Sequence, residues 1–141
     1  MRYWDTSALI PLVVEEEGSR EMEQLFHADE SVATWWGTRV ECLSAIRRKE
    51  REGGLGPEEA NRACAALETL ADDWAEVRPV FELRMTASRL LAVHPLTAGD
   101  AFQLAAALRW AGAISEGAEM ISLDSKLRDA AAREGLICAS P

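Results

Sequence analysis

Histidine and cysteine, which build most zinc sites and many nucleophilic catalytic sites, are scarce in this chain of 141 residues. His27 and His94 stand alone, and the cysteines at positions 42, 64 and 138 share no CxxC or other metal-ligand spacing. An odd number of cysteines fits reduced thiols better than a disulfide framework. We therefore interpret both histidines as structural and expect neither a zinc site nor a Ser–His–Asp triad.

The sequence also lacks a hydrophobic run that approaches the roughly 20 residues of a membrane span. The N-terminal segment MRYWDTSALIPLVVEEE has an acid at position 5 and no small-residue cleavage site, which argues against a signal peptide. A content of 48% hydrophobic and 28% charged residues is typical of a soluble globular protein. We expect one domain over residues 1–141, located in the cytoplasm and not associated with a membrane.

An excess of positive charge is missing as well, because 15 basic residues face 24 acidic ones and the net charge is −9. This balance is unfavourable for a nucleic-acid binder, since phosphate affinity normally comes from Lys and Arg. Bound metal would neutralise some of the acids. The basic residues are also concentrated in residues 39–51, which makes Arg39, Arg47 and Arg48 candidate phosphate contacts. A solvated helix face explains the same stretch equally well.

Short apolar segments alternate with helical patterns along the whole chain. The expected strands cover residues 2–5, 31–35, 74–77, 119–123 and 137–139. The expected helices cover residues 7–14, 19–27, 37–53, 57–70, 80–93, 97–110 and 124–134. On the helix over 37–53, the spacing of Val40, Leu43 and Ile46 predicts the buried stripe. Strands that alternate with helices, without hairpin turns, predict an α/β fold with a central parallel sheet flanked by helices.

Four acids are expected at one edge of this sheet, because ligands of open parallel sheets bind where the strands end. Asp5 closes the first expected strand, and Asp124 follows a later one. Asp100 and Glu41 each lie in the first turn of a helix. Each acid also has a local explanation: a helix cap for Asp5 and Asp124, a helix-dipole partner for Asp100, and ordinary surface charge for Glu41.

Acids that share a site raise one another's pKa values, so their joint placement predicts a compensating divalent cation. Mg²⁺ and Mn²⁺ prefer oxygen ligands, and a set of carboxylates without His or Cys argues against zinc. The strand-end argument supports Asp5, Asp100 and Asp124 as metal ligands. It does not by itself distinguish Glu41 from other surface glutamates.

Four segments, YWDTSALIPL, TRVECLSAIRR, LTAGDAFQLAAAL and ISLDSKLRDAAAREGL, occur in an order and spacing that resemble the PIN domain, particularly the VapC-type toxins of bacterial toxin–antitoxin pairs. The resemblance covers nearly the whole chain. It implies a Rossmann-like PIN fold, dependence on Mg²⁺ or Mn²⁺, and endonucleolytic cleavage of RNA. The acidic quartet of that family maps onto Asp5, Glu41, Asp100 and Asp124.

The same resemblance implies a homodimer and a VapB-like antitoxin that blocks the active site. Thr6 and Ser122 match polar positions that often support the metal site in that family. The adjacent Trp35 and Trp36 are less typical of it. Packing in the core or at a dimer interface is favoured for this pair over stacking on RNA bases.

The corresponding mechanism is hydrolysis of a phosphodiester bond by an activated water. A cation held by Asp5 and Asp100, assisted by Asp124, would lower the pKa of that water and yield a 5′-phosphate product. Glu41 would orient or deprotonate the water, or bind a second ion. One and two ions both remain open. Lys49 and Lys126 are the only lysines, and neither is well placed to replace this chemistry.

Two other functional classes compete with this interpretation. A haloacid-dehalogenase-type phosphatase requires a second Asp where Ser7 stands, and a signalling receiver requires an early acidic pair that is missing. A non-catalytic PIN-like interaction module is the more serious alternative. The presence of all four acids argues against this alternative, because nothing in a purely structural module would compensate for their mutual repulsion.

Overall fold

The computed structural model describes residues 1–114 and 117–139 and contains a parallel sheet of five strands. Their order in the sheet is β3-β2-β1-β4-β5, and every pairing is parallel. The strands are β1 (Arg2–Trp4), β2 (Val32–Trp35), β3 (Ala75–Val77), β4 (Glu119–Ile121) and β5 (Ile137–Ala139). The predicted α/β fold with a central parallel sheet is therefore confirmed.

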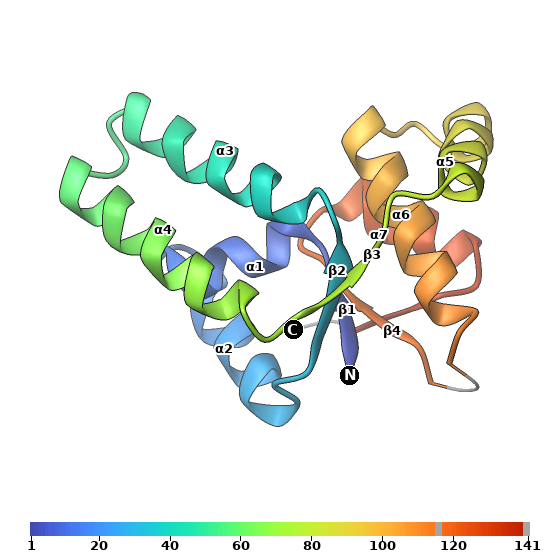
Figure 1. Ribbon diagram of the computed structural model, residues 1–141, viewed down its shortest axis with the longest axis horizontal. Helices are drawn as coiled ribbons and strands as arrows, with labels where there is room; N and C mark the ends of the chain where they lie inside the picture. The colour runs from blue at the N-terminus through green and yellow to red at the C-terminus, as the bar shows by residue number, and fades with distance from the viewer. Residues whose placement is uncertain (115–116, 140–141) are drawn as a thin grey trace.

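Helices cover both faces of this sheet (Figure 1). On one side lie α1 (Thr6–Val13), α2 (Ser19–Ala28), α3 (Thr38–Arg51) and α4 (Pro57–Ala71), and on the other lie α5 (Phe81–Val93), α6 (Ala98–Ala111) and α7 (Ser125–Arg133). The alternation of side chains along β1 divides the core in the same way. Tyr3 packs with α5, α6 and α7, whereas Trp4 packs with the first four helices.

The expected buried stripe of α3 is confirmed at Ile46, which is fully buried, and at Leu43, which is partly buried against the core, but it is wrong at Val40. Thr38, Cys42 and Ile46 face the core, whereas Val40 is 69% exposed. The prediction considered only apolar residues and therefore missed Thr38. This polar residue can be buried because its hydroxyl is hydrogen-bonded to Thr34 inside the fold. All the predicted strands and helices form, with ends that shift by at most two residues.

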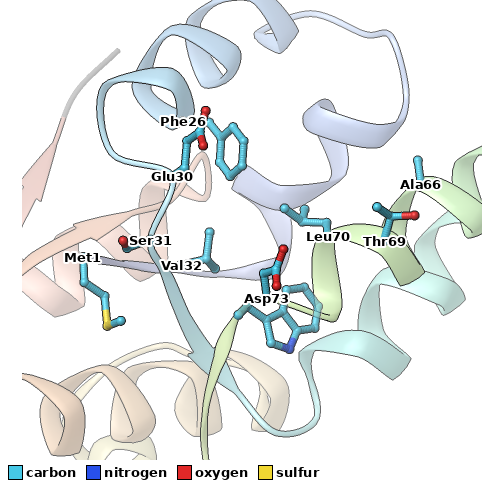
Figure 2. Close-up of a pocket in the computed structure, with 10 residues that line it drawn as sticks. Met1, Phe26, Glu30, Ser31, Val32, Ala66, Thr69, Leu70 and Asp73 are labelled. Atoms are coloured by element: carbon cyan, nitrogen blue, oxygen red, sulfur yellow. The ribbon is translucent and has the colours of Figure 1, made fainter.

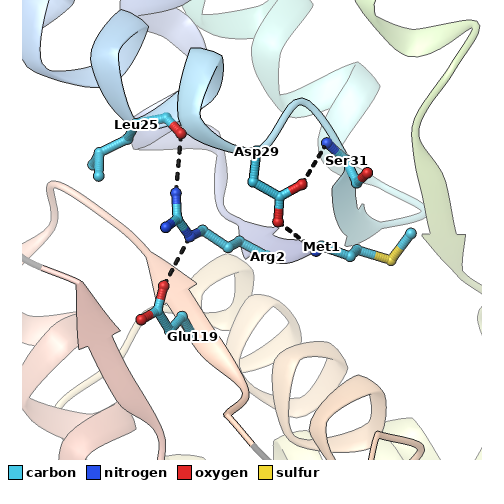
Figure 3. Close-up of polar contacts among 6 residues, drawn as sticks. All are labelled: Met1, Arg2, Leu25, Asp29, Ser31 and Glu119. Carbon is cyan, nitrogen blue, oxygen red and sulfur yellow. Dashed lines mark hydrogen bonds and ion pairs between the residues drawn. The ribbon is translucent and has the colours of Figure 1, made fainter.

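The amino-terminal ends of the strands are tied together by charged groups (Figure 3). Arg2 donates from Nε to Glu119 on β4 at 2.8 Å and from Nη1 to the carbonyl of Leu25 at the end of α2, at 3.0 Å. The N-terminal ammonium of Met1 pairs with Asp29. A cavity of about 570 Å³ between Phe26, Trp74 and their neighbours opens at this same edge (Figure 2). In the described part of the chain, no helix has the length and apolar character that crossing a membrane requires.

Candidate active site

The four predicted acids lie together at the opposite edge, where the strands end. Asp5, Glu41, Asp100 and Asp124 all line one pocket of about 650 Å³, hereafter the acidic pocket. They come from the end of β1, the first turn of α3, the first turn of α6 and the residue that caps α7. The parallel topology brings these distant positions together, because all carboxyl ends of the strands share one edge.

Asp5 is the most deeply buried of the four, with 4% of its surface exposed. It caps α1, and its carboxylate accepts hydrogen bonds from the Ser7 amide at 3.1 Å and the Ser7 hydroxyl at 2.8 Å. Burial raises the pKa of Asp5 to about 6. Hydrogen bonds from Ser7 and Ser122 oppose this rise, and the negative charge of Asp124 adds to it. A bound cation would favour the ionised form and offset the cost of burying it.

Asp124 has the helix-capping contact that its position suggested, and Asp100, expected as a helix-dipole partner, also joins a capping contact. Asp100 Oδ2 accepts from the Thr97 hydroxyl at 2.7 Å, and Asp124 Oδ1 accepts from the Leu127 amide at 2.9 Å. Among the described residues, no hydrogen bond involves Asp100 Oδ1 or Asp124 Oδ2. Capping therefore uses one oxygen of each carboxylate and leaves the other available to the acidic pocket.

Glu41 is held by a polar network that the sequence analysis missed. Its Oε2 accepts from the Thr6 hydroxyl at 2.6 Å and from Gln103 Nε2 at 2.9 Å. Gln103 is 2% exposed, and its Nε2 also lies 2.9 Å from the Thr38 hydroxyl. The Tyr3 hydroxyl donates to Gln103 Oε1 at 2.8 Å, which fixes the orientation of the amide. The available signal was a lone polar residue one turn after Asp100 in a helix rich in Ala and Leu.

The two predicted supporting residues both contact this site, although in different ways. Thr6 binds Glu41 directly. The hydroxyl oxygens of Ser122 and Ser7 are hydrogen-bonded at 3.3 Å, and the Ser7 hydroxyl in turn donates to Asp5. Ser122 also accepts from the Asp124 amide at 3.1 Å. Ser7, which the sequence analysis used only to argue against a phosphatase, is thus the main hydrogen-bond donor to Asp5.

The donor set of the acidic pocket suits a hard cation that keeps part of its water shell. It consists of carboxylate and hydroxyl oxygens, and Mg²⁺ commonly binds through only one or two carboxylates together with substrate phosphate. Among residues 1–114 and 117–139, no group of three or more acids, histidines or cysteines is close enough to form a complete metal cage. The residues present therefore fit a hydrated Mg²⁺ or Mn²⁺ better than a fully protein-ligated ion.

The three candidate phosphate-binding arginines are not equivalent. Arg48 lines the acidic pocket. Arg39 instead pairs with Glu68 on α4, and Arg47 pairs with Glu50 at 2.8 Å. Lys49 also lines the acidic pocket, where it pairs with Glu16 at 2.5 Å. The turn of α3 that carries positions 48 and 49 thus supplies the positive charge at this site.

The histidines and cysteines lie outside the acidic pocket, as expected. His94 Nε2 lies 2.8 Å from Glu134 Oε1, and His27 is an exposed residue 3.8 Å from Glu30. All three cysteines are free. Burial raises the pKa of the Cys42 thiol to about 12, so this thiol stays protonated and unreactive at neutral pH.

Comparison with known structures supports the fold. The chain is 17% identical to the toxin VapC20 of Mycobacterium tuberculosis, described as cleaving the sarcin-ricin loop, with a TM-score of 0.72 and all of both chains covered. It is 20% identical to PAE2754 of Pyrobaculum aerophilum, with a TM-score of 0.64 over 98% of this chain and 89% of that one. FitAcB of Neisseria gonorrhoeae is 14% identical, with a TM-score of 0.69 over 100% of this chain and 98% of that one.

A search of curated proteins found no match. The family model of the PIN domain, however, matches residues 2–133 and so spans almost the whole chain, including all four acids. Together with the parallel sheet and the acidic pocket at its edge, this match shows that the chain belongs to the PIN domain family.

Proposed function

We propose that this protein is an Mg²⁺- or Mn²⁺-dependent endoribonuclease and the toxin of a VapBC-like toxin–antitoxin pair. The observation that carries the proposal is the convergence of four acids, one of them buried, on a single pocket that also holds Arg48. A site of this charge binds a phosphodiester only if a cation and basic groups offset its repulsion. The structurally similar VapC20, which is described as a toxin that cleaves the sarcin-ricin loop, supports the choice of RNA as substrate.

Asp5, Asp100 and Asp124 are the residues that would hold the cation, either directly or through its bound waters. When bound there, a divalent cation lowers the pKa of water and stabilises charge on the phosphoryl oxygens. Burial of Asp5 keeps its carboxylate in one orientation, held by Ser7. The contacts of Thr6 and Gln103 go to Glu41 Oε2, so Oε1 is left to orient the attacking water or accept its proton. Arg48 is placed to bind a phosphate of the substrate.

The test is cleavage of single-stranded RNA by the purified protein with Mg²⁺ or Mn²⁺, and again with excess EDTA. Asp5→Asn and Asp124→Asn should each reduce kcat by at least about 100-fold, as the loss of an essential charged group does. Asp129→Asn is the matched control, because Asp129 is an exposed acid on the same helix as the Asp124 cap and does not line the pocket. Products should carry 5′-phosphate ends. Equal cleavage by all four proteins would refute the proposal.

The proposal extends to the assembly and the cellular setting. We propose that residues 1–141 act as a single domain, form a homodimer in the cytoplasm, and are inhibited by an antitoxin encoded in the neighbouring gene. Light scattering of the purified protein tests the dimer. Co-expression with the product of the neighbouring gene should restore growth that the protein alone arrests, and an unchanged growth arrest would count against the toxin assignment.

A further inference from the structure

A second pocket of about 600 Å³, hereafter the tryptophan pocket, adjoins the acidic pocket along α3. The two pockets share Thr6, Glu41, Ala45 and Arg48. Trp36 and Val40 also line the tryptophan pocket, and they are 55% and 69% exposed. A large exposed indole beside an acidic catalytic site is not explained by packing.

The indole of Trp36 contacts a second aromatic ring. It forms an edge-to-face pair with Trp35, with centroids 6.3 Å apart and an interplanar angle of 70°. Trp35 is 8% exposed and stacks on Phe102 of α6, with centroids 5.5 Å apart and planes 1° apart. Gly37 allows this arrangement because it has no side chain. A Cβ at this position would lie only 2.5 Å from Trp35 Nε1. The backbone amide of Trp36 is anchored to the Val77 carbonyl on β3 at 3.1 Å.

Arg48 supplies a charge at the boundary between the two pockets. It lies two turns beyond Glu41 on α3, and its side chain lines both pockets. Its neighbours Arg47 and Lys49 are held by Glu50 and Glu16, whereas no ion pair of Arg48 is found within the described residues. The two pockets together therefore form a continuous surface that carries the indole of Trp36, the guanidinium of Arg48 and the four acids.

We propose that the tryptophan pocket is a nucleobase subsite, in which the base next to the scissile phosphate stacks on Trp36 while Arg48 contacts an adjoining phosphate. The inference rests on the proposed ribonuclease function. A nucleotide of single-stranded RNA joins a flat aromatic ring to a negative charge, and aromatic and arginine side chains are the groups that bind such strands. An apolar protein segment would match the indole but would leave Arg48 without a counter-charge. Trp36 thus differs from its neighbour Trp35, which packs in the core as expected.

The test measures binding of a fluorescein-labelled single-stranded RNA of mixed sequence by anisotropy, with Ca²⁺ in place of Mg²⁺, and cleavage with Mg²⁺. Trp36→Ala should weaken binding and raise KM by between about fivefold and 150-fold, the range for loss of one base–aromatic stack, with a smaller change in kcat. Trp36→Phe should retain most of the affinity. Phe81→Ala is the matched control, because Phe81 is 68% exposed but lines neither pocket.

An oligomer of the same length made of abasic sugar-phosphate units separates base stacking from backbone contacts. Trp36→Ala should not change the affinity for this oligomer, whereas Arg48→Gln should weaken the binding of both. Unchanged RNA binding by Trp36→Ala would overturn the subsite, as would an equal loss for the abasic oligomer or in Phe81→Ala. If Trp36→Ala weakened only the complex with the antitoxin, the pocket would be a protein contact and the proposal would fail. Wild-type protein that binds RNA but never cleaves it would instead refute the proposed function, and the subsite would still be judged by binding.

Discussion

Asp5 combines two requirements that oppose each other, because a metal ligand must be ionised and a buried carboxyl resists ionisation. Its folded pKa is about 6, above the ordinary value of 3.8, so the folded protein binds the proton more tightly than the unfolded chain does. For such a group the stability of the cation-free protein falls as pH rises from about 4 to about 6 and stays lower above that range. A bound cation would remove this cost by pairing with the carboxylate.

Asp5→Asn should therefore stabilise the protein when divalent cations are removed. The carboxamide carries no charge and keeps one oxygen, which can accept from only one of the two Ser7 donors, so the gain at pH 7.5 should be positive but below about 3 kcal/mol. The gain at pH 4.5 should be smaller, since Asp5 is already mostly protonated there in the folded state. Calorimetric unfolding in EDTA at the two pH values measures it. A gain of the same size at both values would show that charge burial is not the cause.

Gln103 positions Glu41 from the wall of the acidic pocket, since the Tyr3 and Thr38 hydroxyls hold its amide in place. Gln103→Leu keeps the volume but leaves these hydroxyls and Glu41 without their partner. We expect a loss of about 1–3 kcal/mol in the free energy of unfolding. We also expect kcat to fall by roughly 10- to 100-fold with little change in KM, because misplacement of a catalytic group acts on the chemical step.

Urea unfolding and single-turnover cleavage provide the two measurements for Gln103→Leu. Gln24→Leu, on the exposed surface of α2, is the control for the chemical change itself. A variant that loses stability but keeps the wild-type kcat would assign Gln103 to packing alone.

Among the elements, α3 carries the most functions, since its faces divide between the core and the two pockets. Thr38, Cys42 and Ile46 form the buried face, and Val40, Glu41 and Arg48 line the pockets. The helix begins directly after Trp36 and Gly37, so the strand end and the first turn of the helix are built as one unit. One helix thereby connects the hydrophobic core to both the acids and the exposed indole.

This division of α3 predicts unequal costs for two similar truncations. Ile46→Ala removes a fully buried side chain and should lower the free energy of unfolding by about 2–5 kcal/mol. Val40→Ala should change it by less than about 0.5 kcal/mol, because Val40 is exposed. Chemical denaturation of both variants checks the assignment. Comparable losses of stability in the two variants would show instead that Val40, Leu43 and Ile46 form the buried stripe.

At the scale of the whole molecule, the net charge of −9 and the acidic pocket at the sheet edge make the fold sensitive to cations. A ligand that binds only the folded state stabilises it by about 2.7 kcal/mol at a concentration 100 times its Kd. Divalent cations that bind the acidic pocket should therefore raise the Tm in a saturable manner.

Thermal melts with increasing Mn²⁺ measure this effect. Wild type and Asp129→Asn should show the same rise in Tm, and Asp100→Asn should show much less. A matching series in monovalent salt corrects for general screening of the net charge. An equal response of Asp100→Asn and wild type would mean that the ions bind elsewhere.

Most of the fold follows from local sequence signals. Thr97 and Asp100 form the helix-capping contact that their spacing suggests, and the glycines after α3 and α7 lie where those helices stop. The strands were recognisable as short apolar runs between helical patterns, and that alternation determined the parallel sheet. The strand-end positions of Asp5 and Asp124 then predict that both lie at one edge of the sheet.

Only the tertiary structure decided which polar groups meet. Gln103 is 62 residues from Glu41 and 100 from Tyr3, and a sequence carries no signal for hydrogen bonds across such separations. The same holds for the arginines, because the sequence does not distinguish Arg39, Arg47 and Arg48. In the structure, Arg39 pairs with Glu68 of α4 and Arg47 pairs with Glu50 of α3, whereas Arg48 lines the two pockets. Periodicity finds apolar faces, and it therefore missed a buried Thr38 and an exposed Trp36, whose positions depend on the partners that packing brings to them.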